Sequence, residues 1–230
     1  MRYGRWIWML AATLLGAAEM NATAQVRILP LGDSDTSSFA PHSSYRYWLW
    51  HRLVDAGFNV DFVGSQHSVV GGVPANADFD QDHEGHPGWA TPDVLENINS
   101  IAAATQPDIV LIDLGANDVI SGVPLETTTE NFILIIQRLR AVNPQVTILL
   151  AQTPPFEGQD KVAMRLLRRA IRSVAKRENT RESRVYVVNL FGGFSVKKDT
   201  FDGMHPDESG EQKIAKRFFK VLRRVLRRLR

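Results

Sequence analysis

Five short apolar runs, separated by amphipathic segments, set the pattern of this 230-residue chain. The runs are rich in Val, Ile and Leu, which is typical of buried strands, and the expected strands span residues 26–31, 59–63, 109–114, 147–151 and 185–189. Apolar side chains at helical spacing predict helices over residues 44–56, 91–104, 128–141, 161–177 and 207–230. A long loop is expected over residues 64–90. Alternating strands and helices predict one α/β domain, with a parallel sheet and helices on both faces.

Polar, chemically reactive side chains follow several of these strands. Ser34 comes after the first strand, Asn117 after the third, and Asp202 and His205 after the fifth. The carboxyl ends of parallel strands meet at one edge of a sheet, so these loops are expected to meet there, together with the loop that carries Trp89. The sequence therefore predicts a single site at this edge.

The side chains expected at this edge fit acyl transfer from an ester. The Ser34 hydroxyl is a weak nucleophile alone, and it needs a base that is held in place by a third group. His205 would accept its proton, and Asp202, three residues earlier, would fix the imidazole tautomer. The Asn117 amide and the backbone N–H groups of Ser34 and Gly88 are the candidate oxyanion donors.

Each of these motifs also has a purely structural interpretation. Gly32-Asp33-Ser34 and Gly115-Ala-Asn117-Asp118 are common turn compositions, and Asp202-Gly-Met-His205 can be a turn that leads into a helix. Their occurrence together, in this order and each after its own strand, favours a hydrolase.

The same segments resemble the SGNH hydrolase superfamily, also called GDSL-type esterases. Gly32-Asp33-Ser34 is similar to its first block, Gly88 to the glycine of its second, Gly115-Ala-Asn117-Asp118 to its third, and Asp202-Gly-Met-His205-Pro to its fifth. The resemblance covers nearly the whole chain after residue 24. It implies a flavodoxin-like, three-layer αβα fold with a five-stranded parallel sheet in the order 2-1-3-4-5, and catalysis that requires no metal and no cofactor.

A narrower resemblance points to the acetylxylan-esterase branch of the carbohydrate esterases. It is carried by Leu29-Pro-Leu-Gly-Asp-Ser34, Ser44-Tyr-Arg46, Gly57-Phe-Asn-Val-Asp-Phe-Val-Gly-Ser65 and Asp82-His-Glu-Gly-His-Pro-Gly-Trp89. This resemblance implies removal of O-acetyl groups from a polysaccharide such as xylan, with Gly88 donating to the oxyanion. Trp89 and Asp33 are the candidate substrate-binding residues.

Asp35 departs from the family's pattern, in which an apolar residue follows the nucleophile. It places a second carboxylate beside Ser34, and it keeps open a non-catalytic protein that binds carbohydrate or the cell envelope. Among enzymes, the alternative is a lipolytic esterase or lysophospholipase of the same superfamily. Ester hydrolysis that depends on Ser34 separates an enzyme from a binding module, and acyl chain-length preference separates the two enzymes.

A polar cluster at residues 78–86 raises the question of a metal ion. Its Asp-x-Asp-x-Asp spacing is similar to a calcium loop, but His83 stands where that loop has its glycine, and the final acid is missing. His83-Glu-Gly-His86 is one residue short of the zinc-protease spacing. We expect no catalytic metal, a structural cation stays open, and the favoured role is loop architecture, with Glu84 and His86 hydrogen-bonded around the Gly88 turn.

The N-terminal residues predict the compartment. Two arginines precede an apolar run from Trp6 to Ala18, and Ala22-Thr-Ala24 fits a small-residue cleavage site. We expect residues 1–24 to be a signal peptide and residues 25–230 to be a secreted or periplasmic hydrolase domain. A retained membrane anchor is the other interpretation, for which the run is short. The chain has no cysteine, so disulfides and thiolate metal sites are excluded.

Charge is unevenly distributed along the chain. The formal net charge is +2, yet residues 213–230 hold nine Lys or Arg and no acid, so the rest of the domain is net acidic. The last helix is expected to pack an apolar face on the sheet. Its basic face either contacts an anionic membrane, cell wall or acidic polysaccharide, or is simply solvated. Nucleic-acid binding is disfavoured because the body is acidic, and a monomer is expected.

Overall fold

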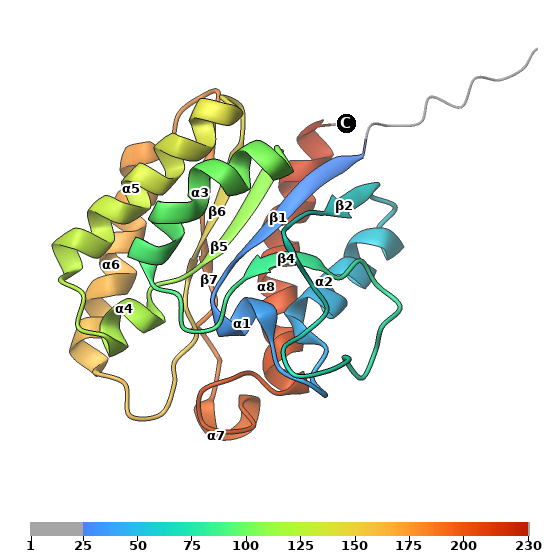
Figure 1. The fold of residues 1–230 in the computed structure, drawn as a ribbon, viewed down its shortest axis with the longest axis vertical. Coiled ribbons are helices and arrows are strands. Elements are labelled where there is room, and N and C mark those ends of the chain that lie inside the picture. The colour runs from blue at the N-terminus through green and yellow to red at the C-terminus, as the bar shows by residue number, and fades with distance from the viewer. Residues whose placement is uncertain (1–24, 230) are drawn as a thin grey trace, which may run out of the picture.

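The computed structural model describes residues 25–229, so the signal peptide expected at residues 1–24 lies outside the described residues. Figure 1 shows one sheet with helices on both of its faces. None of the helices in the described range is long and apolar enough to cross a membrane. The structure therefore has the α/β architecture that the alternating pattern predicts.

Five parallel strands form the centre of the sheet, and they arise from the five apolar runs. They are β1 (Val26–Gly32), β2 (Val60–Phe62), β5 (Ile109–Asp113), β6 (Thr147–Gln152) and β7 (Val185–Asn189). They lie side by side in the order β2-β1-β5-β6-β7, which is the order that the resemblance implies. The register pairs Leu31 with Ile112 and Leu111 with Leu149, so apolar side chains of neighbouring strands line up across the sheet.

The expected count of five strands is too low, because the segment expected as a long loop contains two more. These are β3 (Gln66–His67) and β4 (Asp82–Gly85). β2 pairs with only the first half of β1, and β4 pairs parallel to the second half, with Leu31 opposite Glu84. β3 then adds antiparallel to β4. Both strands are short and polar, so they have no hydrophobic periodicity that would predict them.

Helices cover both faces of the sheet. One face carries α3 (Thr91–Thr105), α5 (Leu125–Val142) and α6 (Lys161–Glu178), and the other carries α2 (Ser44–Asp55) and α8 (Glu208–Leu229). α2 and α8 pack on each other, and Tyr45 of α2 stacks on Phe218 of α8 with ring centroids 5.4 Å apart. Each face of the sheet thus has its own apolar core.

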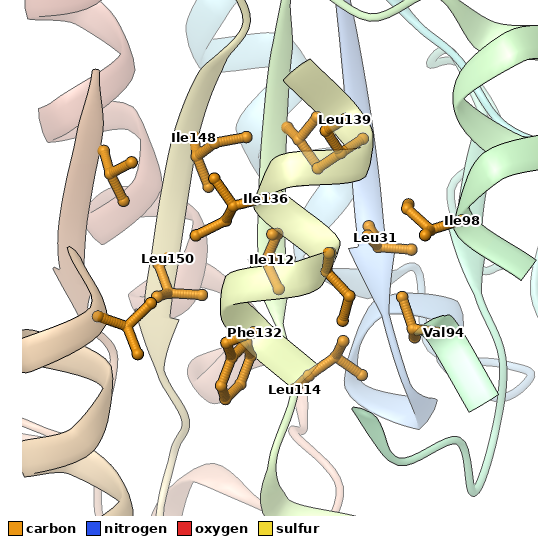
Figure 2. Close-up of a cluster of buried hydrophobic side chains, with 14 of the residues drawn as sticks. Leu31, Val94, Ile98, Ile112, Leu114, Phe132, Ile136, Leu139, Ile148 and Leu150 are labelled. Atoms are coloured by element: carbon orange, nitrogen blue, oxygen red, sulfur yellow. The ribbon is translucent and has the colours of Figure 1, made fainter. Parts of the chain in front are cut away.

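Figure 2 shows the core between the sheet and α5. Phe132, Ile136 and Leu139 lie on one face of α5, against Ile112 of β5 and Ile148 of β6. None of these five side chains is more than 1% exposed. Burying a side chain of this size contributes about 1.5–3 kcal/mol, so a few such contacts fix α5 against the sheet. The helix in turn holds the carboxyl end of β5 in place, and the Gly115-Ala-Asn117-Asp118 motif follows that end.

Three short helices that the periodicity does not predict lie at the carboxyl edge of the sheet. They are α1 (Ser34–Ser37), α4 (Ala116–Ile120) and α7 (Val196–Asp199), and Figure 1 shows all three at the same end of the molecule. Each has only one turn or slightly more, which is too short to show an apolar stripe. Ser34 lies in α1 and Asn117 in α4, and Asp202 and His205 follow α7 in the chain.

Candidate active site

The nucleophile candidate, Ser34, is the first residue of α1, directly after β1. A Cβ on Gly32 would lie 2.3 Å from Thr36 Oγ1 and 2.7 Å from the Asp113 carbonyl oxygen, so only glycine fits where the chain leaves the sheet. Asp33 then caps α1 by accepting a hydrogen bond from the Asp35 N–H at 3.0 Å. This sharp turn holds the half-buried Ser34 hydroxyl at the edge of the sheet.

The base and orienter candidates lie in the loop between β7 and α8. His205 Nδ1 lies 2.6 Å from Asp202 Oδ2, and His205 Nε2 lies 3.1 Å from Ser34 Oγ. Asp202 Oδ1 accepts the backbone N–H groups of Met204 at 2.9 Å and of His205 at 2.7 Å. Burial acts to raise the pKa of Asp202, but the hydrogen bonds from His205 outweigh it and hold the pKa below its ordinary value. The orienter therefore stays ionised.

Two aromatic rings flank the imidazole. Phe39 meets His205 edge-on with ring centroids 4.8 Å apart, and Phe201 lies nearly parallel to it at 5.8 Å. Rings in these positions restrict how far the imidazole can turn. They keep Nε2 toward Ser34, and the His205 side chain stays partly exposed.

The Asn117 amide, one of the three oxyanion donors expected from the sequence, links the turn that carries Ser34 to the turn that carries Gly88. Asn117, in the first turn of α4, donates from its amide to the Trp89 carbonyl oxygen at 3.0 Å and to Asp33 Oδ2 at 3.3 Å. Gly88 has φ +81°, which favours glycine, in the turn just before Trp89. Within residues 25–229, the N–H groups of Ser34 and Gly88 donate to no protein acceptor. They are available to a substrate oxygen.

A model of the GDSL-like lipase/acylhydrolase family matches residues 31–213. The chain belongs to this family. A carbohydrate esterase family 3 structure from Talaromyces cellulolyticus is 30% identical, has a TM-score of 0.80, and matches over 89% of this chain and 99% of that chain. An acetyl esterase structure with an acetate ion is 29% identical at a TM-score of 0.80, over 90% of this chain and 100% of that chain.

One relative is much longer than this chain. A multidomain esterase from Ruminococcus flavefaciens is 26% identical over 219 residues, which cover 85% of this chain but only 28% of that protein. Together these similarities confirm the resemblance to GDSL-type esterases and to carbohydrate esterases. The chain is a carboxylic ester hydrolase of the GDSL-like family.

Asp33, one of the two expected substrate-binding residues of this esterase, is 4% exposed. Its two carboxylate oxygens serve the turn itself, since one caps α1 and the other accepts from the Asn117 amide. Asp33 thus holds the Asn117 amide through this hydrogen bond, and its contact with a substrate stays a prediction. Burial raises the pKa of Asp33 to about 6.

Asp35 is half-buried beside the nucleophile. Burial raises the pKa of Asp35 well above its ordinary range, and the nearby carboxylates of Asp33, Asp113 and Asp202 add to the rise. Asp113, at the end of β5, is 1% exposed, and its oxygens have no hydrogen-bond partner in the described part of the chain. Burial and the charge of Asp33 likewise raise the pKa of Asp113. Like-charge repulsion among these carboxyl groups favours their neutral forms.

Trp89, the other expected substrate-binding residue, lies beside a groove. The groove has a volume of about 610 Å³ and is lined by Trp89 and His86, by polar side chains such as Ser65, and by apolar side chains such as Ile101. None of Ser34, Asn117 and His205 lines it. His86 stacks on Trp89 with ring centroids 3.7 Å apart, so one face of the indole is already covered. His86 Nε2 lies 2.6 Å from Glu84, which also accepts two hydrogen bonds from Ser65. These bonds support the Gly88 turn in the way that the sequence predicts.

The acidic cluster at residues 78–82 is divided among separate partners. Asp78 lies 3.6 Å from His51, Asp80 accepts from the N–H groups of Phe62 and Asp82, and Asp82 pairs with His67 at 2.8 Å. Among residues 25–229, no three His, Asp or Glu side chains converge in a way that could hold a metal ion. The cluster therefore ties the β3–β4 segment to its neighbours.

Asp118 is a buried anchor of the turn after β5. It accepts hydrogen bonds from the Thr91 N–H, the Thr91 hydroxyl and the Thr128 hydroxyl. These bonds join α4 to the first turns of α3 and α5. Ala90 is the N-cap of α3, and the Thr91 hydroxyl donates to Asp118.

The sequence pattern does not single out two buried charged residues that contact α1 and the start of α2. Arg46 is fully buried in α2 and donates to the carbonyl oxygens of four residues, two of them in α1 and two in the segment that precedes β4, namely Thr36, Ser37, Ser68 and Gln81. Burial lowers the pKa of Arg46 to about 10. Glu211 of α8 is 3% exposed and accepts from the Ser44 N–H and from Trp48 Nε1. Both residues lie beside the apolar stripe of an amphipathic helix, and this position is the one signal in the sequence that could have indicated their burial.

Proposed function

We propose that this esterase cleaves its substrate with Ser34, His205 and Asp202. The single observation that carries the proposal is the continuous hydrogen-bond chain from Ser34 Oγ to His205 Nε2 at 3.1 Å and from His205 Nδ1 to Asp202 at 2.6 Å. Serine becomes a useful nucleophile only when a base takes its proton, and histidine serves only when a third group fixes its tautomer. The chain of contacts supplies both conditions.

The reaction would proceed in two halves. Ser34 Oγ forms a bond to the ester carbonyl carbon while its proton passes to His205 Nε2, and the leaving alkoxide then takes that proton as the C–O bond breaks. A water molecule attacks the acyl-serine with the same histidine as base, which releases the acid and restores the Ser34 hydroxyl. Asp202 stabilises the imidazolium in both halves.

The Ser34 and Gly88 N–H groups and the Asn117 amide would stabilise the developing oxyanion. The first two lack protein acceptors within the described range, and Asn117 is held at a fixed position by Trp89 and Asp33. Each such donor contributes about 3 kcal/mol to transition-state stabilisation in other hydrolases. The Asn117 amide would exchange one of its present acceptors for the substrate oxygen.

The substrate that we propose is an O-acetyl group on a polysaccharide such as xylan. The carbohydrate esterase family 3 structure and the acetyl esterase with acetate support this choice, since the chain matches both over nearly their whole lengths. We also propose that the enzyme acts outside the cytoplasm after residues 1–24 are removed.

Acetate release from acetylated xylan tests the proposal, with wild type compared with Ser34→Ala. We expect acetate release by the wild type only. We also expect the rate of hydrolysis of p-nitrophenyl esters to fall as the acyl chain is lengthened beyond acetate. A preference for long acyl chains would instead indicate a lipolytic enzyme. Ester cleavage that is unchanged in Ser34→Ala would end the proposal.

A further inference from the structure

The last helix concentrates positive charge on one side. From Lys213 to the end of α8 at Leu229 there are eight Lys or Arg residues and no acid. The apolar stripe of α8, which includes Phe218 and Leu222, is buried in the core on this face of the sheet. The cations are thus held on a rigid helix and cannot be treated as a loose tail.

Six of these cations, together with Arg52 of α2, line a groove. It has a volume of about 910 Å³ and lies between α8, the end of β7 and the Gly192-Gly193 turn. Seven of its lining residues are Lys or Arg and none is an acid. The half-buried Phe219 and Val187 supply apolar surface to the same groove. The result is a concave surface that combines positive charge with apolar surface.

Three of the lining cations contact the fold: Arg223 lies over the Phe219 ring at 5.7 Å, and the other two make polar contacts. Lys213 pairs with the buried Asp199 at 2.6 Å, and Arg217 donates to the carbonyl oxygens of Asn189 and Gly192. These contacts join α8 to the loops at the carboxyl edge of the sheet. They give one end of the groove a fixed shape.

Lys216, Lys220 and Arg224 make no hydrogen bond or ion pair with any residue from 25 to 229. They follow one another at intervals of four residues, so like charges face each other along the helix, which destabilises it. Arg52 of α2 also lines the groove, and its buried Nε has no acceptor in the described part of the chain. This row of cations is unfavourable for the free protein and becomes favourable when an anion binds.

We propose that this groove binds a polysaccharide that carries carboxylate groups and holds it beside the active site. The choice of a polysaccharide rests on the proposed function. A linear polymer fits a groove, whereas a bilayer would require apolar side chains that project from the surface, and those here lie half-buried. Single-stranded nucleic acid requires successive aromatic platforms, and this groove offers Phe219 alone.

The position of the groove links it to the catalytic loop. Lys213 at one end of the groove pairs with Asp199, which lies three residues before Asp202 in the same loop. The Asp207 N–H donates to the Asp199 carbonyl oxygen at 3.0 Å, which closes this loop around His205. A polymer anchored along α8 would therefore begin next to the loop that carries Asp202 and His205, and a bound chain would present its acetyl groups at raised local concentration.

The test compares binding of a fluorescent oligogalacturonate by the wild type and by a triple variant, Lys216→Ala/Lys220→Ala/Arg224→Ala. All three side chains line the groove, and none belongs to the proposed catalytic groups. We expect an affinity about tenfold lower for the variant and a weaker dependence on salt between about 50 mM and about 200 mM. Hydrolysis of p-nitrophenyl acetate should stay unchanged, since that small ester does not use the groove.

A second triple variant, Arg165→Ala/Arg169→Ala/Arg172→Ala, is the matched control. It removes the same charge from exposed positions of α6, on the opposite face of the sheet. We expect it to bind oligogalacturonate within about threefold of the wild type. Equal losses in the two triple variants would show that net charge alone attracts the glycan, and would overturn the proposal.

Other probes decide between the classes of anion. Vesicles that contain phosphatidylglycerol, and a single-stranded oligodeoxynucleotide, should each bind more weakly than oligogalacturonate. Tighter binding to either, or no binding of oligogalacturonate by the wild type, would refute the groove assignment. Failure of the proposed function has a different signature, namely ester cleavage that does not depend on Ser34, and it is measured independently of glycan binding.

Discussion

Replacing Asp202 with asparagine removes one charge and almost no volume, and the surrounding hydrogen bonds determine how the new amide must lie. Asp202 Oδ1 accepts the backbone N–H groups of Met204 and His205 at 2.9 and 2.7 Å, while Oδ2 faces His205 Nδ1 at 2.6 Å. The amide oxygen has to keep the two backbone bonds, so the NH₂ group faces Nδ1. Nδ1 must then be an acceptor, and the ring proton moves to Nε2.

The magnitude follows from what Nε2 does in the wild type. It lies 3.1 Å from Ser34 Oγ, and once it carries a proton it cannot take another from the hydroxyl. The same change in a serine protease lowers kcat about 10⁴-fold, which corresponds to about 5 kcal/mol of transition-state stabilisation. We expect Asp202→Asn to lower kcat by about this factor, while the fold is unchanged because both backbone bonds are kept.

Two measurements check this reasoning. Steady-state hydrolysis of p-nitrophenyl acetate gives kcat, and ¹⁵N NMR of the His205 ring reports which nitrogen carries the proton. Asp207→Asn is the matched control, because Asp207 makes no hydrogen bond with the His205 ring. Asp207 caps α8 by accepting from the Gly210 N–H at 3.0 Å, and asparagine can accept the same hydrogen bond equally well. A kcat for Asp202→Asn within about tenfold of wild type, or an unchanged tautomer, would refute the argument.

Three further predictions rest on other contacts. Asn117→Ala should lower kcat for p-nitrophenyl acetate by about 10²–10³-fold, because one oxyanion donor is lost. Asp118→Ala should lower the free energy of unfolding in urea by about 3 kcal/mol, since it leaves buried donors of Thr91 without an acceptor. Burial raises the pKa of Glu211 from 4.5 to about 7. Its contribution to stability is therefore complete below about pH 4.5 and is lost, by up to about 3 kcal/mol, as the pH rises through about 7. Urea unfolding at several pH values should thus show Glu211→Gln gaining stability relative to wild type across this interval.

The outcomes that contradict these predictions are distinct. Wild-type kcat in Asn117→Ala would remove that amide from the oxyanion site. Unchanged stability of Asp118→Ala would mean that the Thr91 donors find other acceptors. A difference between wild type and Glu211→Gln that does not vary with pH would show that Glu211 titrates near its ordinary value in the folded protein.

Some parts of the fold were predictable because the cause is local. β5 is buried on both faces and therefore appears as an unbroken apolar run, and α5 repeats its apolar residues at helical spacing. β4 was missed because its four polar residues become a strand only when they meet the free half of β1. The burial of Asp33 was missed for the same kind of reason, since a residue beside a nucleophile is hidden or exposed according to what packs above it.

The sequence by itself determined the order of the five apolar strands and the five long helices, and it placed Asp202 and His205 three residues apart in one loop, where their side chains can pair. Only the tertiary structure decided that His205 lies beside Ser34, which is 171 residues away in the chain. It also decided that Arg46 and Glu211 are buried, and that Lys213 finds an acid while Lys216 does not. Burial and partners depend on which segments the folded sheet brings together, and no local pattern of residues records that.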